Sequence, residues 1–227
     1  MGYKLYRSGC TITQSMFKSV RWKTFPRDFF VAQAGFALFG VAIALIIQAN
    51  LGTGAWGVLA VALADLTSTT PGVMIILSGL LALILAMLLG ERVGWGTVSN
   101  MLFVGPWVDF FLIFIPSVEG KLPLQVAMLL VSIALVGLAS AVYISVDAGA
   151  GPRDSLMLAV SRRFQWSVQR SRATIELGVV LIGWQLEGPV GVGTLVFALL
   201  VGPAVQFGFH LLNVQPHNPP PDVELGG

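Results

Sequence analysis

The sequence GWGTVSNMLFVGP at residues 94–106 returns as GVGTLVFALLVGP at residues 191–203, which is 97 residues further along the chain. No gap is needed to align the two copies, and the same offset places Gly40 on Gly137. One register therefore extends from about residue 35 to residue 210. Self-similarity at a fixed offset over such a length indicates that a whole structural unit has been duplicated.

The composition predicts that this duplicated unit lies in a lipid bilayer. Of the 227 residues, 56% are hydrophobic and 11% are charged, whereas soluble domains carry roughly 25% charged residues. The single cysteine, Cys10, gives neither a disulfide framework nor a metal-type cysteine spacing. Because the histidines are only His210 and His217 and the net charge is +2, we expect no metal site, no cofactor and no nucleic-acid partner.

Six apolar segments are candidates for membrane-crossing helices. They cover residues 29–49, 72–90, 97–116, 124–146, 173–186 and 194–212. Most of them approach the roughly 20 residues that a helix needs to cross a bilayer. A shorter stretch follows the first span of each copy, at residues 56–66 and 154–164. Such a stretch reaches about 16 Å as a helix, half of a hydrocarbon core, so we expect two interfacial or re-entrant helices.

Three spans in each copy imply that the two copies enter the membrane from opposite sides. The predicted fold is therefore an all-α integral membrane protein with six transmembrane helices in two inverted three-helix repeats, at residues 29–118 and 124–213. Substrate sites of such proteins tend to lie where the repeats meet. Duplication can also build a stable bundle that contains no pathway, and the sequence leaves this alternative open.

Basic residues predict the orientation. They cluster before the first span, between the second and third spans and between the fourth and fifth, and only Lys121 falls opposite. The positive-inside rule then places both termini in the cytoplasm, with the chain in the plasma or inner membrane. If the short helices also crossed the membrane, only Arg92 and Arg153 would lie on the non-cytoplasmic side. Charge therefore does not separate the two counts, and the short length of these helices favours six spans. Residues 1–28 are expected to form a basic cytoplasmic or interfacial arm, and residues 214–227 a disordered, proline-rich cytoplasmic tail.

Two aligned glycine loops are candidates for a solute site. Residues 50–57 read NLGTGAWG and residues 147–154 read DAGAGPRD. Glycine allows left-handed backbone and the close approach of a ligand, and amides freed at a helix break can face an anion. The candidate residues in these loops are Asn50, Gly52, Gly54, Trp56, Asp147, Gly149, Gly151, Arg153 and Asp154. The alternative is a pair of tight loops that only lead into interfacial helices.

Three further polar residues within apolar segments are added to the candidate site. Asp109 lies in a run of aromatic and aliphatic residues, where an ionisable group usually faces the bundle interior or a cavity. It can instead be a hydrated, structural residue near the outer interface. Its aligned counterpart is Gln206. Glu176 follows Arg172 by four residues, so a simple ion pair on one helical face accounts for both.

A Gly-Pro pair falls inside the third span of each copy, as Gly105-Pro106 and Gly202-Pro203. Proline in a helix interior removes a hydrogen bond and kinks the helix. Two such kinks would let helices line a shared cavity. They would equally let helices cross closely through small residues, which is the simpler interpretation.

A Gly-x-Gly-Pro-x-Asp loop, together with a Gly-x-Gly-Thr-(x)7-Gly-Pro element, resembles the YczE/YitT-type family of bacterial multi-pass membrane proteins. The loop is residues 149–154, and the second element is the stretch that occurs at residues 94–106 and again at 191–203. The likeness covers most of residues 30–212. The first copy departs from the loop pattern, because Ala-Trp-Gly stands at residues 55–57. The resemblance implies a helical membrane protein of a family with no securely assigned activity.

These patterns predict a small-solute transporter or channel-like protein in the lipid bilayer, with a site for a small polar or anionic solute between the repeats. The alternative is a non-transporting scaffold or accessory subunit that binds a protein partner, with assembly into a homo-oligomer as a further expectation. An enzyme would need a nucleophile, a base or a metal cluster buried together. The sequence contains no such grouping, so neither a catalytic residue nor an enzymatic activity is expected.

Overall fold

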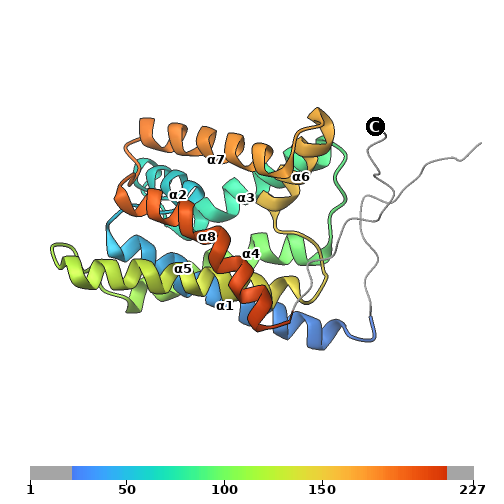
Figure 1. Ribbon diagram of the computed structural model, residues 1–227, viewed down its shortest axis with the longest axis horizontal. Coiled ribbons are helices and arrows are strands. Elements are labelled where there is room, and N and C mark those ends of the chain that lie inside the picture. The colour runs from blue at the N-terminus through green and yellow to red at the C-terminus, as the bar shows by residue number, and fades with distance from the viewer. Residues whose placement is uncertain (1–21, 214–227) are drawn as a thin grey trace, which may run out of the picture.

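The computed structural model describes residues 22–213, which form eight α-helices (Figure 1). The first half contains α1 (Phe25–Ala49), α2 (Ala55–Thr67), α3 (Pro71–Leu88) and α4 (Trp95–Phe114). The second half contains α5 (Leu122–Ile144), α6 (Pro152–Phe164), α7 (Val168–Gln185) and α8 (Val192–Leu211). Of the arm predicted at residues 1–28, the part up to residue 21 falls outside the described residues, as does the tail from residue 214, and α1 already begins at Phe25.

The order of helices repeats in the way the aligned copies predict. Each helix of the second half begins 97 residues after its counterpart in the first half. The two short helices, α2 and α6, are 13 residues long, and each follows the first long helix of its half. Glycine and proline residues explain these boundaries. Glycines interrupt the chain before each short helix, and proline suits the first turn of α3, α5 and α6.

The outer surface of the bundle is apolar. Five helices, α1, α3, α4, α5 and α8, are long and apolar enough to cross a membrane by length and composition. α7 has the same length as α3, 18 residues, but carries Arg170, Arg172 and Glu176. Large apolar side chains are nevertheless exposed on it, as Leu181 (46%) shows, and on α8, as Leu199 (75%) shows. A wide exposed apolar surface is suited to contact with lipid.

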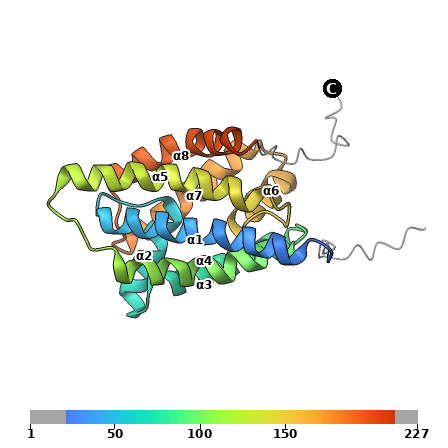
Figure 2. The same cartoon turned by 90° about the horizontal axis from the view of Figure 1, so that it is seen from below.

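The centre of the bundle is formed by α1 and α5, which lie side by side and run antiparallel (Figure 2). Ser132 Oγ donates a hydrogen bond to the carbonyl oxygen of Ala42 (2.8 Å). Gln125 Nε2 donates one to the carbonyl oxygen of Ala49 (2.8 Å). Residue numbers therefore rise along α5 as they fall along α1. Both side chains are buried, and these bonds satisfy polar groups that lipid could not satisfy.

The two halves are interlocked around this central pair. α4 packs against α1 in the first half, and α8 packs against α5 in the second. Each short helix packs against a long helix of the other half: α2 packs against α7, and α6 packs against α3. Glycines allow the equivalent long helices to approach: a Cβ at Gly40 would collide with Trp107, and a Cβ at Gly137 with Ala204. Small residues at helix crossings are typical of membrane bundles.

Both proline-containing helices continue through the proline. Pro106 lies inside α4 and Pro203 inside α8. Figure 1 shows α8 changing direction partway along its length. The kink expected in α4 stays a prediction.

Candidate functional site

Each glycine loop docks onto the other half of the molecule. The amide of Gly193 donates to the carbonyl oxygen of Leu51 (2.7 Å), and the amide of Gly96 donates to that of Ala148 (3.0 Å). These two contacts correspond to each other under the 97-residue offset. A Cβ at either glycine would collide with the docked loop. The repeated Gly-x-Gly-Thr elements are therefore docking surfaces, which sequence analysis did not predict.

Two loop glycines have left-handed backbone, with φ of 101° at Gly52 and 124° at Gly149. L-residues with a side chain rarely adopt this conformation. Gly52 lies against Thr194, and Gly149 lies against Thr97, whose Oγ1 donates to the carbonyl oxygen of Ala150 (2.6 Å). Both glycines thus let the loops turn tightly against the opposite half.

The docked loops lead the chain back into the bundle, where the first turns of α2 and α6 meet. The guanidinium carbon of Arg153 lies 4.9 Å from the centre of the Trp56 ring. This distance is typical of a cation–π contact. Trp56 and Arg153 are counterparts under the 97-residue offset, so a residue of one copy contacts its own equivalent in the other.

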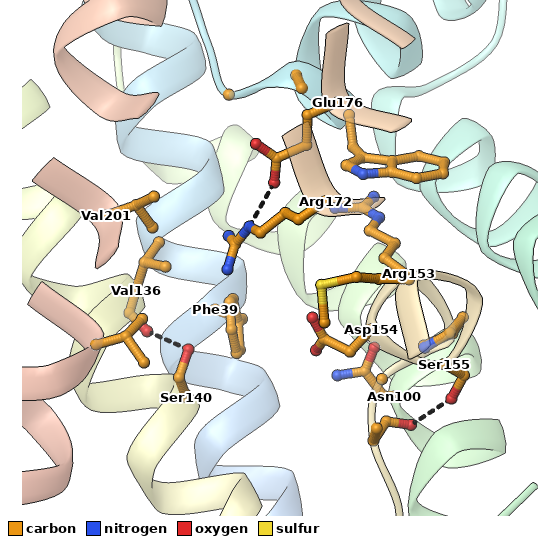
Figure 3. A pocket seen from close by; sticks show the side chains of 18 of the residues that line it. Phe39, Asn100, Val136, Ser140, Arg153, Asp154, Ser155, Arg172, Glu176 and Val201 are labelled. Carbon is orange, nitrogen blue, oxygen red and sulfur yellow. Dashed lines mark hydrogen bonds and ion pairs between the residues drawn. The ribbon is translucent and has the colours of Figure 1, made fainter. Parts of the chain in front are cut away.

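A cavity of about 1830 Å³ opens beside this meeting point (Figure 3). It is lined by residues of all eight helices, including the first turns of α2 and α6. In the close-up view Asp154 and Asn100 lie to the right, Val136 and Val201 lie to the left, and the Arg172 guanidinium, bonded to Glu176, reaches toward Phe39 between them. Its polar lining includes Thr53, Asn100, Ser132, Ser140, Tyr143, Arg153, Asp154, Arg172 and Glu176.

The charged groups of the cavity differ in how they are partnered. Arg172 Nε and Glu176 Oε1 form an ion pair at 2.9 Å, which confirms the predicted pair. Tyr143 donates from its hydroxyl to Asp154 Oδ2 at 3.1 Å. Arg153 forms no hydrogen bond and no ion pair with any residue from 22 to 213, although Asp154 and Glu176 lie close enough to act on its charge. The cavity therefore contains a guanidinium whose donors are unused within the described chain.

Most of the predicted site residues line this cavity. Those brought together are Gly54, Trp56, Asp147, Gly149, Gly151, Arg153, Asp154 and Glu176. Four others do not line it: Asn50, Gly52, Asp109 and Gln206. Asn50 is the left-handed C-cap of α1, with φ of 51°. Gln206 is exposed on α8.

Asp109 does not lie in the cavity, where it was expected, but accepts hydrogen bonds from the start of a neighbouring helix. Its carboxylate accepts hydrogen bonds from Thr70 Oγ1 (2.6 Å) and from the amide of Gly72 (2.8 Å). Thr70 is the N-cap residue of α3, and Gly72 lies in its first turn, where free amides need acceptors. Asp109 thus connects the start of α3 to α4, in agreement with the structural alternative.

The equivalent contact is missing in the second half. A Cβ at Gly105 would collide with the backbone of Gly72, because α3 and α4 cross closely there. At Gly202, the counterpart of Gly105, a Cβ would meet nothing within 4 Å. The counterpart of Gly72 is Gln169, and α7 does not pack along α8 as α3 packs along α4. The cavity opens between α7 and α8, both of which line it.

The polar face of α5 was not predicted from the sequence. Ser132, Val136, Ser140 and Tyr143 all line the cavity. Their spacing of four, four and three residues places them on one helical face. Two serines and a tyrosine on one face of a long apolar segment are a signal that the sequence contains.

Comparison with known proteins places the chain among membrane proteins. Residues 26–210 match a family described as a family of unknown function (DUF6198). An uncharacterized protein of Haemophilus influenzae is 30% identical over 183 residues, which cover 81% of this chain and 84% of the relative. The uncharacterized membrane protein YczE of Bacillus subtilis is 30% identical over 178 residues, covering 77% and 81%. The uncharacterized protein YyaS of Bacillus subtilis is 25% identical over 176 residues, covering 74% and 85%. No solved structure shows a significant match.

Proposed function

The chain belongs to the family of unknown function DUF6198, and from this premise we propose that it moves a small polar or anionic solute across the plasma membrane. The observation that carries the proposal is the polar cavity of about 1830 Å³ beside the meeting point of two short helices, inside a bundle with an apolar exterior. Solute sites of membrane transporters are typically built where interrupted helices meet near the bilayer centre.

Three features support an arrangement of six spans in two inverted repeats. Helix starts are related by a constant offset, α1 and α5 run antiparallel, and Trp56 contacts its own counterpart Arg153. Residues related by a two-fold axis touch each other only near that axis. α7 serves as the sixth span, since its 18 residues reach about 27 Å and two of its charged residues, Arg172 and Glu176, line the cavity.

In this arrangement α2 and α6 are re-entrant helices. Each begins at the meeting point and runs about 20 Å toward one surface, given 13 residues. The basic residues Arg92, Arg162, Arg163 and Arg170 lie at the ends of α3 and α6 and the start of α7. The positive-inside rule makes this end cytoplasmic and places both termini there. The cavity lining includes Arg92, Arg162 and Leu212 from the same end, so the cavity opens to the cytoplasm.

The difference between the halves provides a transport mechanism. Close packing of α3 on α4 seals the outer side, while the separation of α7 from α8 leaves the inner side open. If the two halves exchanged these conformations, the cavity would close inside and open outside. Such an exchange between pseudo-equivalent halves is how inverted repeats produce alternating access.

Cysteine labelling tests this mechanism without knowledge of the solute. Val205 lines the cavity, whereas its counterpart Val108 is fully buried. In a chain with Cys10 replaced, a membrane-impermeant maleimide should modify Val205→Cys from the cytoplasmic face. The same reagent should modify Val108→Cys, more slowly, from the opposite face. A disulfide between Gln169→Cys and Gly202→Cys would hold α7 against α8. It should therefore slow the labelling of Val205→Cys and accelerate the labelling of Val108→Cys.

Two outcomes would overturn the proposal. One is Val108→Cys remaining unreactive from both faces, with or without the disulfide. The other is Val108→Cys and Val205→Cys reacting from the same face. Either result would favour a scaffold or accessory role, in which the repeat supplies only stability.

A further inference from the structure

The guanidinium of Arg153 has N–H donors that no described residue accepts. Arginine presents five N–H groups in a fixed planar fork that matches the two oxygens of a carboxylate. The guanidinium carbon of Arg153 lies over the Trp56 ring, and this contact uses none of the N–H groups as hydrogen-bond donors. Polar groups inside proteins usually have a partner. A ligand in the cavity is in position to provide one.

Both acids near Arg153 are engaged with other groups. Asp154 accepts a hydrogen bond from Tyr143, and Glu176 is paired with Arg172. Neither acid forms an ion pair with Arg153 in the described part of the chain. An anionic group could therefore approach Arg153 without displacing an existing ion pair.

The backbone around Arg153 adds to the attraction for an anion. α6 begins after Gly151 and α2 begins after Gly54, and neither helix has a side-chain cap on its first amides. Both glycines line the cavity. Helix N-termini carry a partial positive charge and favour anions. The fork of Arg153 and the first turn of α2, which has no acidic residue, thus favour negative charge in the same region, whereas the first turn of α6 already contains Asp154.

The wall across from Arg153 combines apolar side chains with the serines of α5. Figure 3 shows Val136 and Val201 on the opposite side of the view from Arg153 and Asp154, with Phe39 between them. Ser140 lies among them, with its hydroxyl occupied by a bond to the carbonyl oxygen of Val136 (2.8 Å). This wall suits the apolar part of a ligand whose charged end is held at the other side.

We propose that Arg153, stacked on Trp56, binds the carboxylate of a small organic acid whose apolar part faces Phe39, Val136 and Val201. This inference rests on the proposed function for why the solute enters, but the binding step can be measured without transport. The counterpart of Arg153 is a tryptophan, so the stacked pair of Trp56 and Arg153 has no second copy in the other half. The pairing is a bidentate, charge-assisted contact.

Benzoate is a suitable probe, and benzamide is its neutral analogue of the same shape. Binding of each is measured by calorimetry to the purified full-length protein in detergent. We expect benzoate to bind the wild type at least tenfold more tightly than benzamide. Arg153→Gln should remove this preference, and Arg153→Lys should retain part of it. The matched control is Arg163→Gln, an exposed arginine of the same helix that does not line the cavity, and it should bind as the wild type does.

Equal binding of benzoate and benzamide by the wild type would overturn the inference, as would equal losses in Arg153→Gln and Arg163→Gln. If Arg153→Gln does not fold, phenylglyoxal modification of the wild type, followed by peptide mass spectrometry, gives the answer. Benzoate should slow modification of Arg153 and leave Arg163 unaffected, and an unchanged rate at Arg153 would contradict the inference. If benzoate binds as expected but the disulfide does not change the labelling of Val108→Cys and Val205→Cys, transport is rejected and the subsite is retained. If the labelling changes as expected but benzoate does not bind, the subsite is rejected and transport is retained.

Discussion

The pair α3 and α4 and the pair α7 and α8 have the same lengths and the same order, yet only the first pair is closely packed. In the first pair Gly72 faces Gly105, and Asp109 accepts two hydrogen bonds from the start of α3. The second pair has Gln169 and Gln206 at the equivalent positions of Gly72 and Asp109. These two positions are among those at which the closely packed pair differs from the open pair.

The comparison also shows that a glycine alone does not create a close crossing. Gly105 and Gly202 are counterparts, but only Gly105 lies against another helix. The partner helix must also have a small residue where the two backbones approach. A charged acceptor must then satisfy the amides at the end of the partner helix. The first half meets both conditions, and the second half meets neither.

The largest expected effect comes from filling the close crossing. Gly105→Leu would place a side chain against the backbone of Gly72, which cannot move aside cheaply, so the free energy of unfolding should fall by about 3 kcal/mol. Gly202→Leu should change it by less than about 0.5 kcal/mol, since open space surrounds this position. Unfolding midpoints in mixed micelles measure both. Similar losses in the two variants would show that the halves do not differ as described.

Removal of the carboxylate that holds the start of α3 should have the next largest effect. Asp109→Ala leaves Thr70 Oγ1 and the amide of Gly72 without their acceptor, which should cost about 1–2 kcal/mol of stability. The counterpart change, Gln206→Ala, should be neutral within about 0.5 kcal/mol because the side chain is exposed. Hydrogen exchange at the amide of Gly72 should accelerate in Asp109→Ala. Unchanged exchange would separate Asp109 from this role.

A transplant of the closed contact into the second half should have a smaller effect. The double variant Gln169→Gly with Gln206→Asp recreates the first-half pair, and Ser167 already occupies the position of Thr70 as the N-cap of α7. A gain of about 1 kcal/mol for the closed form corresponds to roughly a fivefold change in the ratio of closed to open forms. The labelling rate of Val205→Cys should therefore fall, by at most about fivefold. Each single variant serves as the control, and a rate that rises in the double variant would contradict the prediction.

The smallest expected effect concerns an ion pair that has no equivalent in the other half. Arg162 lies 3.1 Å from Glu91, with side-chain exposures of 65% and 10%, and the counterparts are Asp65 and Gly188. Because the arginine is largely exposed, Arg162→Ala should lower stability by less than about 0.5 kcal/mol, and the loss should shrink at high salt. Arg163→Ala gives the baseline in the same assay. A loss as large as that of Asp109→Ala would mean that Arg162 has a further role.

Local features of the sequence were sufficient to predict the helix order. The short helices expected at residues 56–66 and 154–164 occur as Ala55–Thr67 and Pro152–Phe164. Hydropathy and the glycine and proline positions act within a few residues, so they can be recognised without knowledge of the fold. The loop residues that line the cavity, including Trp56 and Arg153, were recognised for the same reason.

Contacts between distant segments could not be predicted in the same way. Leu51 and Gly193 are joined by a hydrogen bond across the two halves, and no local pattern names the partner of either. Asp109 was expected to face a cavity because its neighbours are apolar, but its partners are Thr70 and Gly72, at separations of 39 and 37 residues. The difference between Gly72 and Gln169 was visible in the aligned copies, yet its meaning depends on which helices touch.

The docking of each loop on the opposite half has a consequence for biosynthesis. When the ribosome has completed α4, the carbonyl of Leu51 still lacks its donor, because Gly193 has not yet been synthesised. An unsatisfied carbonyl in a lipid environment is costly. We therefore expect the first half to remain at the insertion machinery as an incomplete assembly until α8, whose first turn contains Gly193, has been inserted. A nascent chain halted before that point should be a preferred target for membrane quality-control proteases.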